Sequence, residues 1–439
     1  MASGGERRRP RVCVVGAGPC GLTALKNLKT EGICDVVCYD EGHSIGGSWV
    51  FDDRPERHSV YEATHLISSK RMSDFEDFPL PDDFPDFPSH RQMRTFFEDY
   101  AAHFGVKKFV RLATRVVRAE LLPDHRWRVA TIGADGAHED SFDYLIICTG
   151  HHREPFRPEY PGQFSGEVLH STEYKRPDSF RDKRVLVVGG GNSACDIAVD
   201  VARVAQKTCI SMRRGYHIVP KLIFGRPSDL LYARLRRNAP MPKSVLQRFL
   251  EALVHLNVGP MERYGLQRPE GRLLEMHPTL NSDILNALRD GRVLPRVGIR
   301  SFEAGTVCFD AGRPEQFDVI IWGTGYRIRF PFLDKSVVTW DDSGPVPLYL
   351  KMMHKQIPSV FFIGLFQPIG CIWRLADHQA RIAALQIKGA LGRPRDIEVR
   401  IDKEISSPHW RFDKAPRHAV EVDYHDFRHE LLKEIGGTS

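Results

Sequence analysis

Two segments of the chain share one order of apolar and polar positions. Residues 11–28 read RVCVVGAGPCGLTALKNL: a short apolar strand ending at Val15, a glycine turn, and helix-forming residues from about Gly21. Residues 184–202 read RVLVVGGGNSACDIAVDVA and repeat that order. A strand, a glycine turn and a helix form the context in which G-x-G-x-x-G indicates dinucleotide binding. The pattern therefore predicts an α/β protein with two Rossmann-like dinucleotide-binding domains.

A second repeat follows each of these units. DYLIICTG at 143–150 and DVIIWGTG at 318–325 share an acidic start, an apolar strand and a terminal Thr-Gly. We interpret each as a strand that closes one nucleotide domain, with its Thr-Gly turn near the cofactor. Two similar buried strands without ligand contact are the alternative.

Composition and charge narrow the class of protein. The 439 residues are 42% hydrophobic and 27% charged, as in ordinary globular proteins, and predict two or three domains. A net charge of +6 spread among 56 acidic residues argues against a nucleic-acid partner. The nine cysteines form no CxxC or zinc-ligand spacing, which favours reduced thiols and no metal site. Neither a secretory signal nor an apolar run of about 18 residues occurs, so we expect a soluble cytoplasmic protein without a membrane anchor.

The glycine turns suggest how each domain holds a diphosphate. The first glycine permits the tight turn, the second lets the backbone approach the ligand, and the third small residue packs the helix on the strand. These places are Gly16, Gly18 and Gly21 in the first motif and Gly189, Gly191 and Ala194 in the second. Unpaired amides at the helix start attract the diphosphate. A glycine turn without ligand is the alternative.

The ends of the second strands distinguish the two sites. Asp40 lies nineteen positions beyond Gly21, where a carboxylate accepts hydrogen bonds from a ribose 2′-hydroxyl. Arg213 lies nineteen positions beyond Ala194, and Arg214 follows it. Guanidinium groups there bind a 2′-phosphate. The first site therefore suits FAD or NAD and the second suits NADP, with a solvated strand end as the alternative for the arginines.

An FAD site and an NADP site in one chain imply hydride transfer to a flavin. The chain has no CxxC, so it lacks the cysteine pair of a thioredoxin-reductase-like enzyme. Reduced flavin is then left to react with oxygen or with a diffusible acceptor.

The segment FSGEVLHSTEY at 164–174 matches the pattern F-x-G-x-x-x-H-x-x-x-[YF], and with it the chain resembles the flavin-containing monooxygenases, a family of class B flavoprotein monooxygenases. Related Baeyer–Villiger monooxygenases usually carry Trp at the last position, which is Tyr174 here. Further matches span nearly the whole chain: GAGPCGL, IGGSW, DFPLPDDFPDF, CTGHH, GGGNSACDIA, GTGY, FPFLD and DHQAR. Vertebrate members end in a hydrophobic anchoring segment that is not found here, so the chain is similar to a soluble, bacterial-type member.

The resemblance implies an NADP-binding domain inserted into an FAD-binding domain. We expect the first part of the FAD domain at 1–165, the NADP domain at 166–325 with a helical insertion at about 227–272, and the return of the FAD domain with C-terminal helices at 326–439. Three interpretations of the insertion stay open: a cover over the substrate entrance, a solvent-exposed helical hairpin, or an oligomer contact, such as that of a homodimer.

The resemblance also implies the reaction. NADPH reduces the flavin, O2 adds to give a C4a-hydroperoxyflavin, and this oxygenates nitrogen or sulfur in small lipophilic amines or thioethers. Baeyer–Villiger oxygenation of ketones, a peroxide-leaking NADPH oxidase and a non-catalytic redox-sensing flavoprotein are the alternatives.

Cofactor-binding residues carry over position by position. For FAD they are Gly16, Gly18, Gly21 and Asp40, with Gly47, Ser48 and Trp49 beside it. Asn192, Ser193 and Ala194 approach the NADP diphosphate, and Arg213 and Arg214 meet its 2′-phosphate. The expected set is completed by Pro19, Cys20, Glu41, Thr149, Gly150, Gly189, Gly191, Thr324, Gly325 and Gln379.

One position departs from the family. Typical members place an Asn beside the flavin where alignment from Tyr61 puts Ile67. Ile67 has no amide to donate, so His65 or Ser68 takes over as the catalytic residue, or the oxygenating intermediate is short-lived and hydrogen peroxide escapes. A loop that only packs under the flavin is the alternative for both residues.

Overall fold

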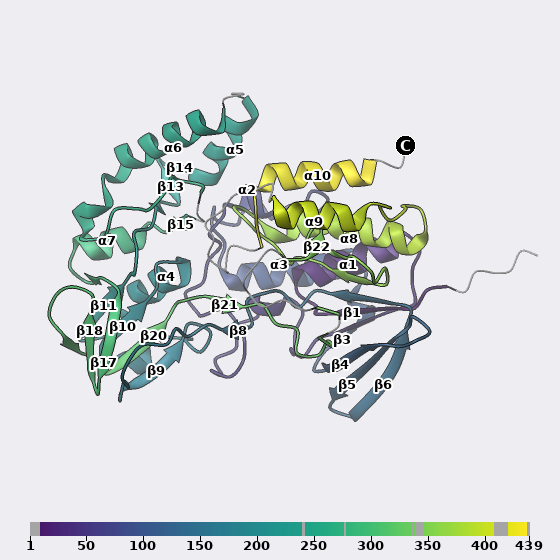
Figure 1. Ribbon diagram of the computed structural model, residues 1–439, viewed down its shortest axis with the longest axis horizontal. Helices are drawn as coiled ribbons and strands as arrows, with labels where there is room; N and C mark the ends of the chain where they lie inside the picture. The colour runs from purple at the N-terminus through teal and green to yellow at the C-terminus, as the bar shows by residue number, and fades with distance from the viewer. Residues whose placement is uncertain are drawn as a thin grey trace, which may run out of the picture.

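The computed structural model describes residues 9–238, 242–275, 278–335, 337–338, 346–407 and 420–436. Two lobes lie side by side, each built on its own sheet (Figure 1). The first sheet has the strand order β22-β23-β24-β7-β1-β2-β3. Its strands are β1 (Val12–Val15), β2 (Val36–Tyr39), β3 (Val110–Arg111), β7 (Tyr144–Ile147), β22 (Leu348–Tyr349), β23 (Met353–His354) and β24 (Val360–Phe362).

Helices cover one face of the first sheet and an antiparallel meander covers the other (Figure 1). The helices are α1 (Pro19–Thr30), α3 (His90–His103), α8 (Ile372–Lys388), α9 (Ile397–Ser406) and α10 (Tyr424–Gly436). The meander is β4 (Arg115–Leu121), β5 (Trp127–Gly133) and β6 (Gly136–Phe142). Trp127 of β5 is fully buried, and its indole N–H donates to Ser359 Oγ at 3.0 Å. This bond ties the meander to the loop that leads into β24.

The second sheet has five parallel strands in the order β16-β11-β10-β20-β9. They are β9 (Glu167–His170), β10 (Arg184–Val188), β11 (Lys207–Ser211), β16 (Leu294–Arg296) and β20 (Val319–Trp322). The same lobe contains the helices α4 (Asn192–Val201) and α7 (Asp283–Arg289). It also contains an antiparallel meander of β17 (Ile299–Glu303), β18 (Thr306–Phe309) and β19 (Glu315–Gln316). All five second-sheet strands lie between β7 and β24 in the chain. The predicted α/β fold, with one Rossmann-like domain inserted into the other, is therefore confirmed.

The second lobe carries two further helices, and the first of them contacts the first lobe. They are α5 (Ser228–Asn238) and α6 (Lys243–Val258), preceded by the hairpin of β13 (Leu222–Ile223) and β14 (Arg226–Pro227). Asp229 of α5 accepts a hydrogen bond from Ser69 N at 2.6 Å, and Arg236 of α5 pairs with Asp426 of α10 at 2.9 Å. Thus α5 is attached to the first lobe at both ends, whereas Phe249 and Leu256 of α6 are exposed.

The chain passes between the lobes twice, and the two crossings pair with each other. The pair consists of β8 (Glu154–Pro155) and β21 (Tyr326–Arg327), which are antiparallel. The remaining short elements are α2 (Lys70–Ser73), β12 (Ile218–Val219), β15 (Thr279–Leu280), β25 (Gln367–Pro368), β26 (Glu421–Val422) and the 3-10 turns η1 (Gly47–Trp49), η2 (Lys107–Phe109), η3 (Asp178–Phe180) and η4 (Met261–Tyr264). Among the residues that the structure describes, every helix is too short or too polar to cross a membrane.

Candidate functional site

The first glycine turn joins β1 to α1 and leaves no room for a side chain at Gly16 or Gly21. Gly16 has φ +103°, and a Cβ on it would lie 2.7 Å from the carbonyl oxygen of Cys148. A Cβ on Gly21 would lie 1.8 Å from the carbonyl oxygen of Gly16. Gly18 is the N-cap of α1, and no side chain caps the helix start. The backbone amides there remain available to an anion, as a diphosphate site requires.

The segment expected beside FAD packs against this turn. Gly47 has φ +59°, and a Cβ on it would lie 2.9 Å from Gly18 Cα, so the two backbones are in close contact. Ser48 and Trp49 follow in η1. The Trp49 ring meets Trp373 of α8 edge to face, with 5.9 Å between the ring centroids. Segments from three parts of the chain thus gather at the start of α1.

Asp40 is fixed at the end of β2 by two backbone amides. Its Oδ2 accepts from Ala17 N at 2.6 Å, and its Oδ1 accepts from Gly42 N at 2.7 Å. Burial raises the pKa of Asp40, and the two hydrogen bonds partly offset that effect. The next residue, Glu41, forms an ion pair with Arg153 at 2.8 Å. An acceptor carboxylate therefore stands beside the first glycine turn, in the place that suits a ribose hydroxyl.

The second glycine turn repeats the arrangement. Gly189 has φ +134°, and a Cβ on it would lie 2.3 Å from the carbonyl oxygen of Gly323. Ala194 packs closely against Gly323: a Cβ on Gly323 would lie 2.6 Å from the Ala194 Cβ. Gly191 is the N-cap of α4 without side-chain capping, and a Cβ on it would meet nothing within 4 Å. This open space before an uncapped helix fits a diphosphate.

Side chains at the start of α4 and the end of β11 frame that space. Asn192 Oδ1 accepts from Leu280 N at 2.8 Å, and Ser193 follows it, partly buried. Arg213 is exposed, and the Arg214 guanidinium lies over the Tyr216 ring, 5.7 Å from its centroid. The structure therefore places two cations at the strand end where a 2′-phosphate was expected.

One Thr-Gly turn follows β7 of the first sheet, and the other follows β20 of the second sheet. Gly150 has φ +71° and Gly325 has φ +88°, and a Cβ on either would meet nothing within 4 Å. Thr149 is partly buried, while the Thr324 hydroxyl donates to the carbonyl oxygen of Phe156 at 2.5 Å. Both turns therefore face open space, and their contact with cofactor stays a prediction.

Gln379 is fully buried in α8, away from open space. Its Oε1 accepts from Gly364 N at 2.9 Å, and its Nε2 donates to the carbonyl oxygen of Leu350 at 2.8 Å. A Cβ on Gly364 would lie 2.4 Å from Cys20 Sγ, next to Pro19 at the start of α1. The amide of Gln379 thus supports the turn behind the first glycine motif.

The segment around Ile67 is held by the second lobe. Tyr61 donates to Asp196 Oδ2 of α4 at 2.7 Å, and Lys221 Nζ donates to the carbonyl oxygen of Leu66 at 3.1 Å. Asp196 also accepts from Asn281 Nδ2 at 2.5 Å. Burial raises the pKa values of Tyr61 and Asp196.

The two proposed substitutes for the missing Asn lie differently in this segment. His65 is exposed, and its Nδ1 bonds to the carbonyl oxygen of Ala63 at 2.8 Å. Ser68 is buried, and its hydroxyl bonds to the Ser73 hydroxyl at 2.8 Å. Their catalytic roles stay predictions. We did not predict Tyr61, Asp196 or Lys221, although Asp196, one of two acids among the largely apolar residues of the second glycine helix, was a usable signal.

The FSGEVLHSTEY segment fixes the passage between lobes. A Cβ on Gly166 would lie 2.5 Å from the carbonyl oxygen of Asp318, so only glycine lets this strand approach β20. His170 is fully buried; its Nε2 donates to the carbonyl oxygen of Gly325 at 3.0 Å, and its Nδ1 accepts from Thr172 N at 3.3 Å. The Tyr174 hydroxyl donates to Asp200 Oδ2 at 2.7 Å. His170 therefore supports the second Thr-Gly turn through its backbone.

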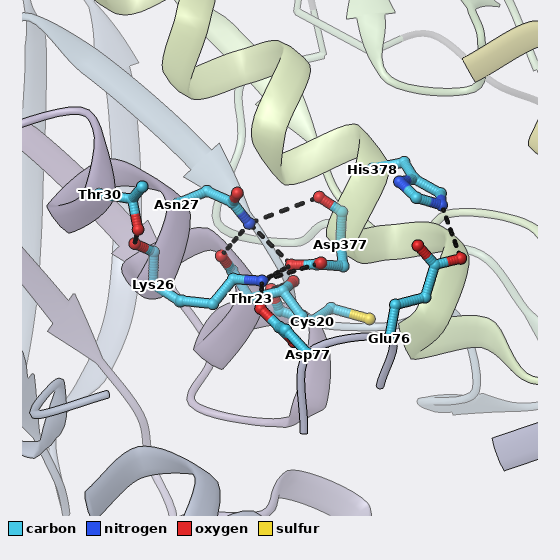
Figure 2. A network of polar contacts seen from close by, with 9 residues as sticks. All are labelled: Cys20, Thr23, Lys26, Asn27, Thr30, Glu76, Asp77, Asp377 and His378. Carbon is cyan, nitrogen blue, oxygen red and sulfur yellow. Dashed lines mark hydrogen bonds and ion pairs between the residues drawn. The ribbon is translucent and has the colours of Figure 1, made fainter. Parts of the chain in front are cut away.

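A buried polar network anchors α1 to α8 (Figure 2). Lys26 is 6% exposed, and its Nζ lies 2.7 Å from carboxylate oxygens of both Asp77 and Asp377. Asn27 Nδ2 donates to Asp377 Oδ1 at 2.7 Å. The network holds the helix whose N-terminus forms the first glycine turn.

Two Rossmann-like lobes, each with a glycine turn before an uncapped helix, define an oxidoreductase that binds two dinucleotides. The chain belongs to the flavin-binding monooxygenase-like family, whose model matches residues 9–439. This confirms the resemblance drawn from the sequence. FAD and NADPH are the cofactors of this family and of this chain.

Individual relatives agree with that assignment. The chain is 34% identical to flavin-containing monooxygenase 5 of Rattus norvegicus, covering 98% of this chain and 83% of the relative. It is 33% identical to dimethylaniline monooxygenase [N-oxide-forming] 2 of Mus musculus, covering 97% of this chain and 82% of that protein.

Two solved structures show the same fold. S-allyl-L-cysteine S-oxygenase from Allium sativum has a TM-score of 0.72 at 24% identity, covering 97% of this chain and 88% of its own. NADP+-bound cyclohexanone monooxygenase from Rhodococcus sp. Phi1 has a TM-score of 0.73 at 16% identity, covering 98% of both chains.

Proposed function

We propose that the protein catalyses NADPH- and O2-dependent oxygenation of nitrogen or sulfur in small lipophilic nucleophiles. The observation that carries the proposal is the pair of glycine turns, one beside the Asp40 carboxylate and one beside Arg213 and Arg214. The N-oxide-forming name of one relative and the family model support oxygen transfer to a heteroatom.

The chain's own residues bind and orient in this reaction. The amides at the start of α1 and Asp40 hold FAD, and the amides at the start of α4 with Arg213 hold NADPH. Bound FAD supplies the reaction with dioxygen. The buried His170 keeps the Gly325 turn in place, and the contacts of Tyr61 and Lys221 hold the 61–69 segment against the second lobe.

A second candidate function is NADPH oxidation that releases hydrogen peroxide. Ile67 offers no polar group, the Ser68 hydroxyl is bonded to Ser73, and His65 is exposed. A site with few polar partners for reduced oxygen favours escape of peroxide. The two functions differ in how much oxygenated product and how much hydrogen peroxide are formed per NADPH consumed.

A coupling experiment decides between them. Purified FAD-loaded protein is given NADPH and air, with N,N-dimethylaniline, methyl phenyl sulfide, cyclohexanone or no substrate, while oxygenated product and peroxide are quantified. We expect N-oxide or sulfoxide to account for most of the NADPH. Full peroxide yield with every substrate would favour the second candidate, and lactone as the sole product would establish Baeyer–Villiger oxygenation.

The NADP assignment has its own test. Arg213→Ala is expected to raise the KM for NADPH about tenfold or more while leaving the KM for NADH nearly unchanged, because only NADPH carries the 2′-phosphate. Arg248→Ala, which removes an exposed arginine from α6, is the control. Equal losses with both nucleotides would contradict the role of Arg213.

A further inference from the structure

A cavity of about 750 Å³ lies where α5 of the second lobe meets α2, α8 and α10 of the first. Figure 1 shows α5 near the start of α10, with α2 close to both. The volume is that of a site for a small organic molecule. Its walls come from four helices that are far apart in the sequence, so the cavity exists only when the two lobes are assembled.

Arginine is the most frequent side chain in the lining of this cavity. Its lining contains no carboxylate side chain and six arginines: Arg71, Arg234, Arg236, Arg237, Arg374 and Arg428. Guanidinium groups bind carboxylates and related anions through paired, charge-assisted hydrogen bonds. A cluster of this size therefore favours an anionic ligand over a neutral or cationic one.

Carboxylates outside the lining hold several of these arginines in place. Arg236 pairs with Asp426 of α10 at 2.9 Å, and Arg428 of α10 pairs with Glu76 at 2.7 Å. Arg374 of α8 lies 3.3 Å from Asp74. The guanidinium groups are thus positioned before any ligand arrives, which lowers the entropic cost of binding.

Arg234 differs from the others. It is exposed on α5, and it has no ion pair or hydrogen bond with any part of the chain that the structure describes. Arg71, on the opposite wall, forms an ion pair with the exposed Asp82 at 3.7 Å, the one ion pair that it makes among the residues that the structure describes. These two arginines have the capacity to bind an added anion.

The remainder of the lining is largely apolar. Met72 comes from α2, Leu230 and Ala233 from α5, and the almost buried Tyr424 from α10. Burying a hydrocarbon portion against these side chains contributes roughly 0.8 kcal/mol per methylene. A ligand that contacts both the arginines and the apolar side chains has an anionic group attached to an apolar chain.

We propose that this cavity is a binding site for an organic anion, a carboxylate or sulfonate carried on a short apolar chain. Helix α8 links the site to the region expected around FAD, because it carries both Arg374 of the lining and Trp373, whose ring meets Trp49. Binding at this site is independent of the proposed oxygenation and is measured without turnover.

Calorimetric titration of the FAD-loaded protein tests the site. Octanoate, octanesulfonate, octanamide and octylammonium share one chain length and differ in charge. We expect octanoate and octanesulfonate to bind one per chain, about tenfold or more tightly than octanamide, because only the anions pair with guanidinium. Equal affinity for octanoate and octanamide would overturn the proposal.

Three variants locate the binding. Arg234→Gln and Arg71→Gln change opposite walls at exposed positions, and each is expected to weaken octanoate about tenfold while weakening octanamide little. Arg248→Gln removes an equally exposed arginine on α6, outside the cavity, and is expected to bind octanoate as the native protein does. The same loss in all three variants would show a general charge effect and overturn the proposal.

A vesicle experiment separates the small anion from a membrane. Sedimentation with phosphatidylglycerol vesicles is compared with and without saturating octanoate, using phosphatidylcholine vesicles as the control. We expect no sedimentation with either lipid. Sedimentation with phosphatidylglycerol that octanoate abolishes, and that Arg234→Gln weakens, would assign the arginines to a lipid surface and overturn the small-ligand proposal.

Discussion

Gly189 and Gly191 lie two residues apart in the second glycine turn, and we expect glycine at the two positions for different reasons. Gly189 has φ +134° and faces the Gly323 carbonyl, whereas Gly191 has room for a Cβ. Gly189→Ala is expected to lower the free energy of unfolding by about 1–3 kcal/mol or more, because the new Cβ overlaps backbone. Urea unfolding of the FAD-loaded protein measures this loss.

Gly191→Ala is the matched variant and is expected to behave in the opposite way. Its free energy of unfolding without NADP+ stays within about 0.5 kcal/mol of the native value, because nothing lies within 4 Å of the new Cβ. Its affinity for NADP+ falls, because the methyl group occupies the space expected for the diphosphate. Native affinity in Gly191→Ala would contradict the assignment of that space.

His170 and His58 make stability depend on pH. Burial lowers the pKa of each to about 4 from the ordinary value of 6.5. Between about pH 6.5 and 4 the unfolded chain binds protons at these groups that the folded chain does not. The free energy of unfolding therefore decreases as the pH falls through this range, with a slope of about 1.4 kcal/mol per pH unit for each group.

The variant His170→Gln isolates one of these contributions, because glutamine retains a donor for the Gly325 carbonyl but does not titrate. We expect its free energy of unfolding to depend less steeply on pH than that of the native protein between about pH 6.5 and 5. His43→Gln, at an exposed position, should keep the native slope. Identical slopes in all three proteins would refute the assignment to His170.

At the scale of elements, the buried network between α1 and α8 is a testable anchor (Figure 2). Lys26→Met removes the buried cation between Asp77 and Asp377 and is expected to cost about 1.5–3 kcal/mol, because the partly buried Asp377 carboxylate loses a charge-assisted hydrogen bond. Lys29→Met, one turn along the same helix, removes an exposed hydrogen bond to Phe104 and is expected to cost about 1 kcal/mol or less.

Chemical denaturation of both variants gives the comparison. Equal losses would mean that Lys26 contributes no more than a surface lysine. Lys26→Met combined with Asp377→Asn should recover part of the stability, because the uncompensated charge is removed with its partner.

The strand–turn–helix units were predictable because their signals are local. An apolar run before Gly16 or Gly189 and a helical pattern after it lie within about twenty residues, and both units formed as expected. The pairing of Lys26 with Asp377 was not predictable, because it joins residues 351 positions apart. Likewise, Tyr61 meets Asp196 only because the two lobes pack together. The sequence therefore indicated the cofactor turns and did not reveal what holds them.

At the scale of the whole molecule, the second lobe restrains the segment that carries Ile67 and Ser68. Lys221→Met removes the hydrogen bond to the Leu66 carbonyl and replaces no residue of the glycine turns. If the proposed oxygenation holds, the amount of hydrogen peroxide formed per NADPH consumed should rise, because the looser segment admits water to the site.

Peroxide and oxygenated product per NADPH measure this change, with Lys29→Met as the control. A raised KM for NADPH with unchanged peroxide would instead assign Lys221 to nucleotide binding.

The paired crossings at β8 and β21 have a consequence for how the protein is made. The first sheet needs β24 beside β7, yet residues 148–359 separate these strands in the chain. On the ribosome, the complete second sheet emerges during that interval, while the first sheet still lacks three of its strands. The apolar edge of β7 lacks its partner β24 until the entire inserted lobe has been synthesised. The lobe that begins the chain is therefore the last to complete its fold.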